Sequence, residues 1–465
     1  MGTFNLIEPK FVPPLEKAFR PAVLANRVFE KEAAAVGVPL LIGILRDKGE
    51  LAHFTTKVFP EGHPCAQANL PYVERLIKFL LWQRGGFKVY IGGPKSVGNT
   101  IRKCYAPDGE REFDYHFLGE QVYEQPFTVV PCGLSEVPAA SETGKPLGRH
   151  LDGCRIGFDL GASDRKVSAV VDGQVVYSEE VIWEPRKHSD PEYHYGEIFT
   201  ALKTAASKIA HVDAIGGSCA GIFIDNRPMV ASLFRGIPSQ RFPEIRDLFL
   251  RLRNEFNVPL EVINDGDVTA LAGSMSLEDN GVLGIAMGSS EAAGYVDPNG
   301  HIMGWLNELA FAPIDYNPQA ARDEWSGDIG CGSQYFSQQC VFRLAPKAGI
   351  QIPVDLIDAE KLVFVQEKLE NGQEGAVKIW QSMGIYLGYG LAHYADFYEI
   401  KHVLILGRCT SGKGGTLILE GAKSVLQAEF PELADRIQIH LPDEKNRRVG
   451  QSIAAASLPA TISEK

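Results

Sequence analysis

The sequence predicts an α/β protein of two or three domains, and three observations lead to this class. The chain has 465 residues, which is more than one cooperative core usually covers. Its hydrophobic content of 45% and its charged content of 22% are ordinary for a globular protein. Short apolar runs of strand length alternate with segments that carry the apolar spacing of a helix. We therefore expect strands and helices to alternate along most of the chain.

The first 150 residues predict an additional α/β module. VPLLIGIL (38–45) and FKVYIGG (87–93) are typical of buried strands, and YVERLIKFLLWQR (72–84) has helical spacing between them. Proline, glycine and small polar residues then crowd residues 131–149, a composition that indicates a linker. We place a domain boundary near residue 150, and the sequence assigns no function to this module.

Downstream of residue 150, strands and helices are expected in a regular succession. They are a strand–turn–strand (155–170), a strand (174–182), a helix (196–209), a strand (212–217), a helix (243–257), a strand (260–263), a helix (266–275), a glycine-rich hairpin region (281–304), helices (357–370 and 375–398), a strand (402–407), a helix (415–428), a short strand (437–441) and a terminal helix (445–457).

The strand–turn–strand pattern occurs twice, as RIGFDLGASDRKVSAVV (155–171) and VLGIAMGSSEAAGYVD (282–297). A tight turn of small residues lets backbone N–H groups approach an anion closely. Two such hairpins can hold the two ends of a polyphosphate, and Asp159 at the end of the first strand is placed to bind a metal or a metal-bound water. The alternative is two ordinary hairpins in which the aspartate only forms a turn.

A third segment, PLEVINDGDVTALAG (259–273), places a carboxylate where a strand becomes a helix. Ligands of α/β folds usually bind at such junctions, so Asp265 is positioned to accept a proton from a substrate hydroxyl. The structural alternative is a helix N-cap, which is a common role for aspartate and is compatible with the first.

Taken in order, these segments resemble the ROK family of sugar kinases, within the actin/hexokinase/Hsp70-like ATPases. The resemblance covers about residues 153–457. It rests on GFDLGAS (157–163), AIGGSCAG (214–221), VINDGDVTALAG (262–273), GIAMGSSEAAGYV (284–296), WLNELAFAPID (305–315), GDIGC (327–331) and HVLILGRCTSGKGG (402–415).

The resemblance implies a two-lobed actin-like (RNase H-like) ATPase fold and ATP-dependent phosphorylation of a sugar hydroxyl. The first lobe would span residues 151–266 and 445–465, and the second lobe residues 267–444. Asp265 would be the general base, Asn264 and Glu308 would bind the sugar, and Asp159 would organise Mg²⁺. The residues expected to contact ATP are Gly161, Ala162, Ser163, Gly288, Ser289, Gly407 and Gly412.

The sequence departs from the family pattern mainly on the sugar side. Of the family's zinc ligands only Cys331 remains, with Glu324 and Ser326 at other positions, and one thiolate cannot build a tetrahedral site, so no zinc is expected. Phe311 replaces a histidine, and Ser333 replaces a glutamate. Glu291 in the second hairpin is expected to bring negative charge toward the phosphates. These losses leave a second interpretation open, a non-catalytic sugar-binding regulatory protein.

Charge and cysteine usage restrict the partners and the compartment. A net charge of −12 argues against a general nucleic-acid surface. The eight cysteines are scattered and favour a reduced, cytoplasmic protein. No secretory signal or membrane-spanning stretch is expected, and the family resemblance implies a homodimer.

Two further loops have ambiguous phosphate-binding patterns. YIGGPKSVGNTIRK (90–103) could bind an anion at a helix N-terminus, but turn formation is the favoured interpretation. GRCTSGKGG (407–415) nearly matches a P-loop, yet Gly414 stands where the Mg²⁺-binding hydroxyl belongs. Lys413 therefore either touches a phosphate or is an ordinary loop lysine, with the second favoured.

Overall fold

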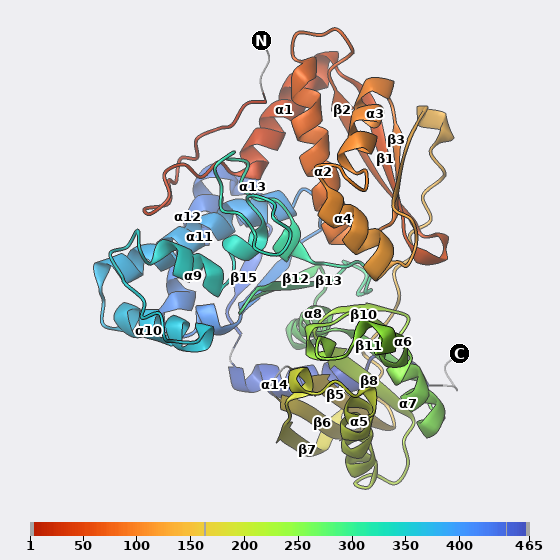
Figure 1. Cartoon of the computed structure of the whole chain (residues 1–465). Helices are drawn as coiled ribbons and strands as arrows, with labels where there is room; N and C mark the ends of the chain where they lie inside the picture. The colour runs from red at the N-terminus through yellow and green to blue at the C-terminus, as the bar shows by residue number, and fades with distance from the viewer. Residues whose placement is uncertain (1–3, 162–163, 443, 462–465) are drawn as a thin grey trace. The chain divides into compact units, whose positions relative to one another are not determined.

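The computed structural model describes residues 4–161, 164–442 and 444–461, and the chain forms two compact units. Unit 1 consists of Met1–Thr143, Ile285–Ala293 and Trp305–Leu441, whereas unit 2 consists of Gly144–Gly284, Gly294–Gly304 and Pro442–Lys465. Figure 1 labels most of the elements used below. None of the described helices combines the length and the apolar character needed to cross a bilayer.

The N-terminal part of unit 1 is a four-stranded sheet with the order β2-β1-β3-β4, drawn in red and orange in Figure 1. Its strands are β1 (Val38–Leu45), β2 (Leu51–Val58), β3 (Lys88–Gly92) and β4 (Thr128–Cys132). Strand β1 pairs antiparallel with β2 and β3, and β3 pairs parallel with β4. The accompanying helices are α1 (Ala22–Val36), α2 (Asn69–Arg84), α3 (Lys95–Cys104) and α4 (Glu112–His116).

A second four-stranded sheet has the order β13-β12-β14-β15, and most of it lies in unit 1. Its strands are β12 (Val282–Met287), β13 (Glu291–Val296), β14 (His402–Leu406) and β15 (Gln438–His440). The helices of this part are α9 (Gln338–Leu344), α10 (Asp358–Glu370), α11 (Glu374–Tyr394), α12 (Lys413–Glu429) and α13 (Pro431–Ala434). Helices α11 and α12 pack closely along each other, because Gly384, Gly388 and Gly421 remove side chains from their contact.

Unit 2 is built on a five-stranded sheet with the order β11-β8-β5-β6-β7. Its strands are β5 (Cys154–Leu160), β6 (Asp164–Val171), β7 (Gln174–Ile182), β8 (Ala214–Cys219) and β11 (Leu260–Asn264). Strands β5, β8 and β11 run parallel, whereas β5, β6 and β7 form an antiparallel meander. A short two-stranded sheet pairs β9 (Ile222–Ile224) with β10 (Arg227–Val230).

The helices of unit 2 are α5 (Pro191–Ala206), α6 (Phe242–Arg246), α7 (Leu248–Phe256), α8 (Asp265–Leu277) and α14 (Glu444–Ala456). Helix α14 lies directly on the middle of the sheet. A Cβ at Gly157 or at Gly216 would overlap the backbone of α14, so these two glycines allow the close contact.

Unit 1 joins the N-terminal residues to segments far along the chain. The backbone of Ala22 donates to the carbonyl of Ile314 at 2.8 Å, and Tyr386 Oη donates to Glu16 Oε2 at 2.7 Å. Arg27 forms an ion pair with Asp396 at 3.0 Å. The first 143 residues therefore share one compact unit with α9–α13.

Most expected elements are found with small shifts, but the expected helix 243–257 is divided into α6 and α7. The structure also adds strands that the sequence pattern did not reveal. Strands β2, β4, β9 and β10 are the additions. Part of the expected 131–149 linker is the end of β4. The division of the chain at residues 150, 266 and 445 stays a prediction.

Candidate functional site

The carboxyl ends of three parallel strands in unit 2 bring together residues that are distant in sequence. Asp159 near the end of β5 pairs in register with Ser218 of β8, and Asn264 at the end of β11 pairs with Cys219. Because parallel strands end at the same edge of the sheet, Asp265 lies near Asp159. The charge of Asp159 therefore affects the pKa of Asp265.

Asp265 is the first residue of α8 and is half-buried. Its Oδ1 accepts a hydrogen bond from the backbone N–H of Gly266 at 3.1 Å. Burial, and next the nearby charge of Asp159, raise the pKa of Asp265 to about 6. A carboxylate with this pKa is mostly ionised at pH 7 and is a better proton acceptor than an ordinary aspartate.

The two oxygens of Asp159 have different neighbours. Ser218 Oγ donates to Oδ1 at 2.7 Å, and Lys166 Nζ lies 3.9 Å from Oδ2. The hydrogen bond from Ser218 orients the carboxylate of Asp159. The residue is half-buried, so the carboxylate is also accessible to a ligand. The sequence interpretation missed both Ser218 and Lys166, because their contacts with Asp159 cross between strands.

The first hairpin is closed at Gly161, whose N–H donates to the carbonyl of Asp164 at 2.9 Å. Trp183 Nε1, from the residue after β7, donates to the Gly161 carbonyl at 2.9 Å. The expected phosphate contacts Ala162 and Ser163 lie outside the described residues.

Asn264 is committed to the backbone through both ends of its amide. Its Oδ1 accepts from Gly266 N at 2.7 Å as the N-cap of α8, and its Nδ2 donates to the Gly221 carbonyl at 2.8 Å. The start of α8 is also held from β13, where Tyr295 N donates to Asp267 Oδ1 at 3.1 Å. These hydrogen bonds hold the junction between β11 and α8 in place.

In unit 1, the second hairpin places Gly288 and Ser289 between β12 and β13. Gly288 N–H donates to the Ser290 carbonyl at 3.1 Å, and Ser289 is exposed. Gly407 has a φ of +100°, and a Cβ there would lie 2.5 Å from the carbonyl oxygen of Met287. The structure therefore brings Gly288 and Gly407 to the same end of this sheet, and only glycine fits at position 407.

Glu291 does not bring charge to the second hairpin, and that expectation is wrong. The side chain is buried, with 3% exposure, and Oε1 accepts from Tyr394 Oη at 3.1 Å. Burial, with a further contribution from Glu308, raises the pKa of Glu291 to about 8. The group is therefore mostly protonated and neutral at pH 7.

The loop from Gly407 to Gly412 leads into α12. Gly412 has a φ of +60° and lies against the carboxylate of Glu370, which accepts from Lys413 N at 2.9 Å. Lys413 Nζ donates to the Glu370 carbonyl at 2.6 Å. The backbone N–H and the Nζ of Lys413 thus both bind Glu370. This supports the interpretation of Lys413 as an ordinary loop lysine. A carboxylate also occupies the α3 N-terminus, where Ser96 N donates to Glu61 Oε1 at 3.2 Å.

Glu308 lies on a segment that rests on α2. Its backbone N–H donates to the Trp82 carbonyl at 2.9 Å, and the side chain is half-buried. Phe311 packs on Trp82 with ring centroids 4.3 Å apart. Phe311 therefore anchors this segment to the N-terminal module.

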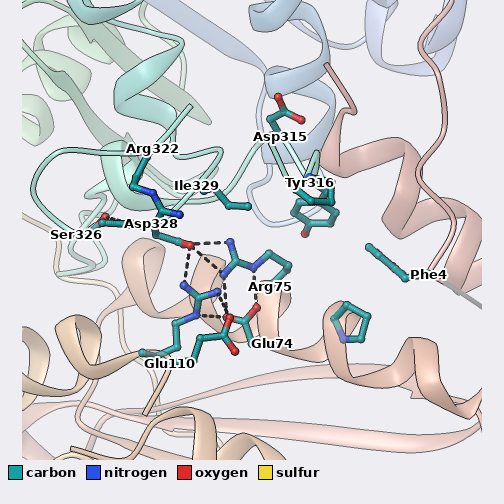
Figure 2. Close-up of a pocket in the computed structure, with 14 residues that line it drawn as sticks. Phe4, Glu74, Arg75, Glu110, Asp315, Tyr316, Arg322, Ser326, Asp328 and Ile329 are labelled. Carbon is teal, nitrogen blue, oxygen red and sulfur yellow. Dashed lines mark hydrogen bonds and ion pairs between the residues drawn. The ribbon is translucent and has the colours of Figure 1, made fainter. Parts of the chain in front are cut away.

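The segment that resembles the zinc motif is held by ion pairs (Figure 2). Asp328 lies 2.7 Å from Arg111, 3.0 Å from Arg75 and 3.3 Å from Lys78. Burial opposes the ionisation of Asp328, but Lys78 and Arg75 outweigh it and lower its pKa. Burial also raises the pKa of the Cys331 thiol. These residues do not fit a zinc ion, because three cations already neutralise Asp328 and Cys331 is the one cysteine of the segment 324–331.

Known proteins resemble this chain in fold. No family model matches the sequence, and no curated protein matches it. A ROK hexokinase from Thermus thermophilus superposes with a TM-score of 0.51 at 17% identity, covering 65% of this chain and 97% of that chain. A ROK glucokinase from Streptomyces griseus gives 0.47 at 20% identity, covering 65% and 99%. A ROK transcriptional regulator, a homologue of the E. coli MLC protein, gives 0.49 at 18%, covering 66% and 79%.

The likeness to the Thermus thermophilus hexokinase extends over 97% of that protein. At 17% sequence identity, this likeness shows a shared fold and nothing further. The predicted fold class is confirmed, and the chain shares its fold with the ROK hexokinase of Thermus thermophilus.

Proposed function

We propose that this protein is an ATP-dependent carbohydrate kinase in which Asp265 is the general base. The single observation that carries the proposal is the placement of the Asp265 carboxylate near that of Asp159 at the carboxyl edge of β5, β8 and β11. The fold shared with a ROK hexokinase supports the same activity. Asp265 takes the proton of a sugar hydroxyl as that oxygen attacks the γ-phosphate of ATP.

Asp159 is the proposed Mg²⁺ contact, and the donor set fits this ion. Mg²⁺ prefers oxygen ligands and retains several waters, and Asp159 offers a half-buried carboxylate that Ser218 orients. When bound, Mg²⁺ neutralises charge that develops on the phosphates. The backbone of Gly161, with Ala162 and Ser163, is the proposed contact for one end of the polyphosphate.

The remaining roles follow the same proposal. Gly288 and Ser289 contact the other end of the polyphosphate, and Gly407 and Gly412 contact the nucleoside. Glu308 hydrogen-bonds a sugar hydroxyl. Asn264 keeps Asp265 in place through its N-cap bond, with one amide hydrogen left for the sugar.

The second candidate function is a sugar-binding regulatory protein without turnover. The burial of Phe311 against Trp82 favours it, because a polar sugar contact of the family is replaced there by an apolar anchor.

The deciding experiment is a coupled ADP-release assay with Mg·ATP against hexoses, amino sugars and sugar acids, with thermal-shift readings for each. Asp265→Asn should lower turnover on the active sugar about 10²–10⁴-fold and leave sugar affinity unchanged. The matched control is Asp267→Asn in the same helical turn, which keeps an acceptor oxygen for Tyr295 N and should retain turnover.

The pH profile gives a second readout of the same residue. Asp265 must be ionised to accept a proton, so kcat/KM should fall as the pH drops below about 6. Sugar-dependent stabilisation without ADP release above the Asp265→Asn level would establish the regulatory protein. Full turnover in Asp265→Asn would contradict the assignment of the base.

A further inference from the structure

A second group of metal-ligating side chains lies in unit 2 at the beginning of the parallel strands. Cys154 is the first residue of β5, and His211 and Asp213 immediately precede β8. The register that pairs Arg155 with Ala214 places Cys154 beside Asp213. One ligating atom from each of the three residues lies within 4.8 Å of those of the other two.

Backbone hydrogen bonds hold this group in place. Asp213 N donates to the Cys154 carbonyl at 2.8 Å, and Cys154 N donates to Asp213 Oδ2 at 2.8 Å. His211 Nε2 lies 3.2 Å from the same carboxylate oxygen. Gly153 has a φ of +75°, and a Cβ there would lie 2.5 Å from Asp213 Oδ2, so the glycine leaves space for the carboxylate.

The three side chains differ in their exposure to solvent. Cys154 is buried, the side chain of Asp213 is 31% exposed, and that of His211 is 64% exposed. A metal ion can therefore approach Asp213 and His211 from solvent. The exposed imidazole reaches the ion by leaving its 3.2 Å contact with Asp213 Oδ2.

We propose that Cys154, His211 and Asp213 bind a divalent transition metal of the Zn²⁺ class, with water as the fourth ligand. A thiolate and an imidazole select such ions over Mg²⁺ and Ca²⁺, which prefer oxygen ligands. Tetrahedral bonds to zinc place neighbouring ligand atoms about 3.5 Å apart, which small side-chain rotations can reach from the present spacing. The Cys154 thiol releases its proton to solvent as the metal–sulfur bond forms.

This site is separate from the proposed kinase chemistry. It lies where β5 and β8 begin, whereas Asp159 and Asp265 lie where strands end. It also uses none of the residues between 324 and 331, for which no zinc was expected. The metal ties two adjacent strands together, and we expect it to raise the thermal stability of the protein without being needed for turnover.

The test uses the full-length, reduced and metal-stripped protein with Co²⁺ as a spectroscopic probe. One equivalent of Co²⁺ should give a thiolate-to-metal charge-transfer band in the near ultraviolet, and Zn²⁺ should displace it. Cys154→Ser should abolish the band, and Cys132→Ser, a half-buried cysteine in unit 1, should retain it. Because His211 is exposed, His211→Ala should fold normally and weaken Co²⁺ binding at least about 100-fold.

Two results would overturn the proposal. One is the absence of a thiolate band when the wild-type protein is mixed with stoichiometric Co²⁺. The other is a band that persists in both Cys154→Ser and His211→Ala. Neither result bears on the kinase proposal, which the ADP-release assay tests independently.

Discussion

Glu291 illustrates how burial changes the chemistry of a single residue. Its side chain lies in unit 1 against Tyr394 and Gly332, and one carboxylate oxygen has no hydrogen-bond partner. An ionised carboxylate is costly in such surroundings, and the pKa rises to about 8 from the ordinary value of 4.5. The folded chain therefore keeps a proton that the unfolded chain loses between these two pH values.

This difference predicts the pH dependence of Glu291→Gln. The folded-state pKa is raised, so the contribution of Glu291 to stability is full below about pH 4.5 and is lost as the pH rises to about 8. The variant carries no titrating group, so its melting temperature relative to wild type should increase from pH 5 to pH 8.5. Thermal unfolding at several pH values measures this.

The control for this prediction is Glu374→Gln. Glu374 is exposed, and its hydrogen bond and charge interaction with Lys378 lower its pKa. The melting temperature of Glu374→Gln relative to wild type should not increase comparably as the pH rises. Equal pH profiles for Glu291→Gln and wild type would contradict the neutral state of Glu291.

At the scale of the elements, α2 supplies buried cations to the loop that ends at Cys331. Lys78 is 1% exposed and pairs with Asp114 at 3.1 Å and with Asp328 at 3.3 Å. Its positive charge is stabilised by both carboxylates. A buried pair of this kind contributes little relative to apolar packing, but removing one partner leaves an uncompensated charge.

Lys78→Met should therefore lower the free energy of unfolding by about 3–5 kcal/mol. The matched control is Lys378→Met, which removes an exposed ion pair with Glu374 and should change stability by at most about 1 kcal/mol. Urea denaturation of both variants gives the comparison. A loss at Lys78 no larger than that at Lys378 would show that the network does not hold the loop.

The contact between α14 and β8 gives a second prediction about elements. Gly216 faces the helix so closely that a Cβ would overlap the carbonyl oxygen of Ala455. Gly216→Ala should destabilise the protein by about 1–3 kcal/mol, because backbone must move. Gly196→Ala in α5 meets no atom within 4 Å and should stabilise by up to about 1 kcal/mol through helix propensity. Thermal unfolding distinguishes the two, and changes of the same sign would contradict the close packing of α14.

At the scale of the whole molecule, the N-terminal residues are part of unit 1. Helix α2 is buried along almost its whole length, including Trp82 and Lys78. Glu16 pairs with Arg343 and accepts from Tyr386, which ties the N-terminal segment to α9 and α11. Removal of this segment would expose apolar and charged surface together.

A chain that lacks residues 1–143 should therefore lose cooperative unfolding in unit 1. The near-ultraviolet circular dichroism should weaken, and limited proteolysis should cleave within 305–441, which the full chain protects. An unchanged proteolysis pattern would instead support an independent N-terminal module, as the sequence suggested.

The sequence by itself determined the elements that have a local apolar pattern. VPLLIGIL predicted β1, and YVERLIKFLLWQR predicted most of α2, because periodic apolar residues specify a strand or a helix wherever the chain folds. The strand-to-helix junction at Asp265 and the two small-residue hairpins were also visible for this reason. Strand β2 was missed, because its polar residues in LAHFTTKV hide the alternation.

Only the tertiary structure decided the properties that depend on contacts between distant residues. Burial of its side chain makes Glu291 mostly neutral at pH 7. The packing of α2 brings the cations of Arg75 and Lys78 to Asp328. The register of β5 and β8 brought Cys154 to Asp213. Local periodicity reports which face of an element is apolar, but charge states and ligand sets depend on which elements pack together, and these distances do not appear in the sequence.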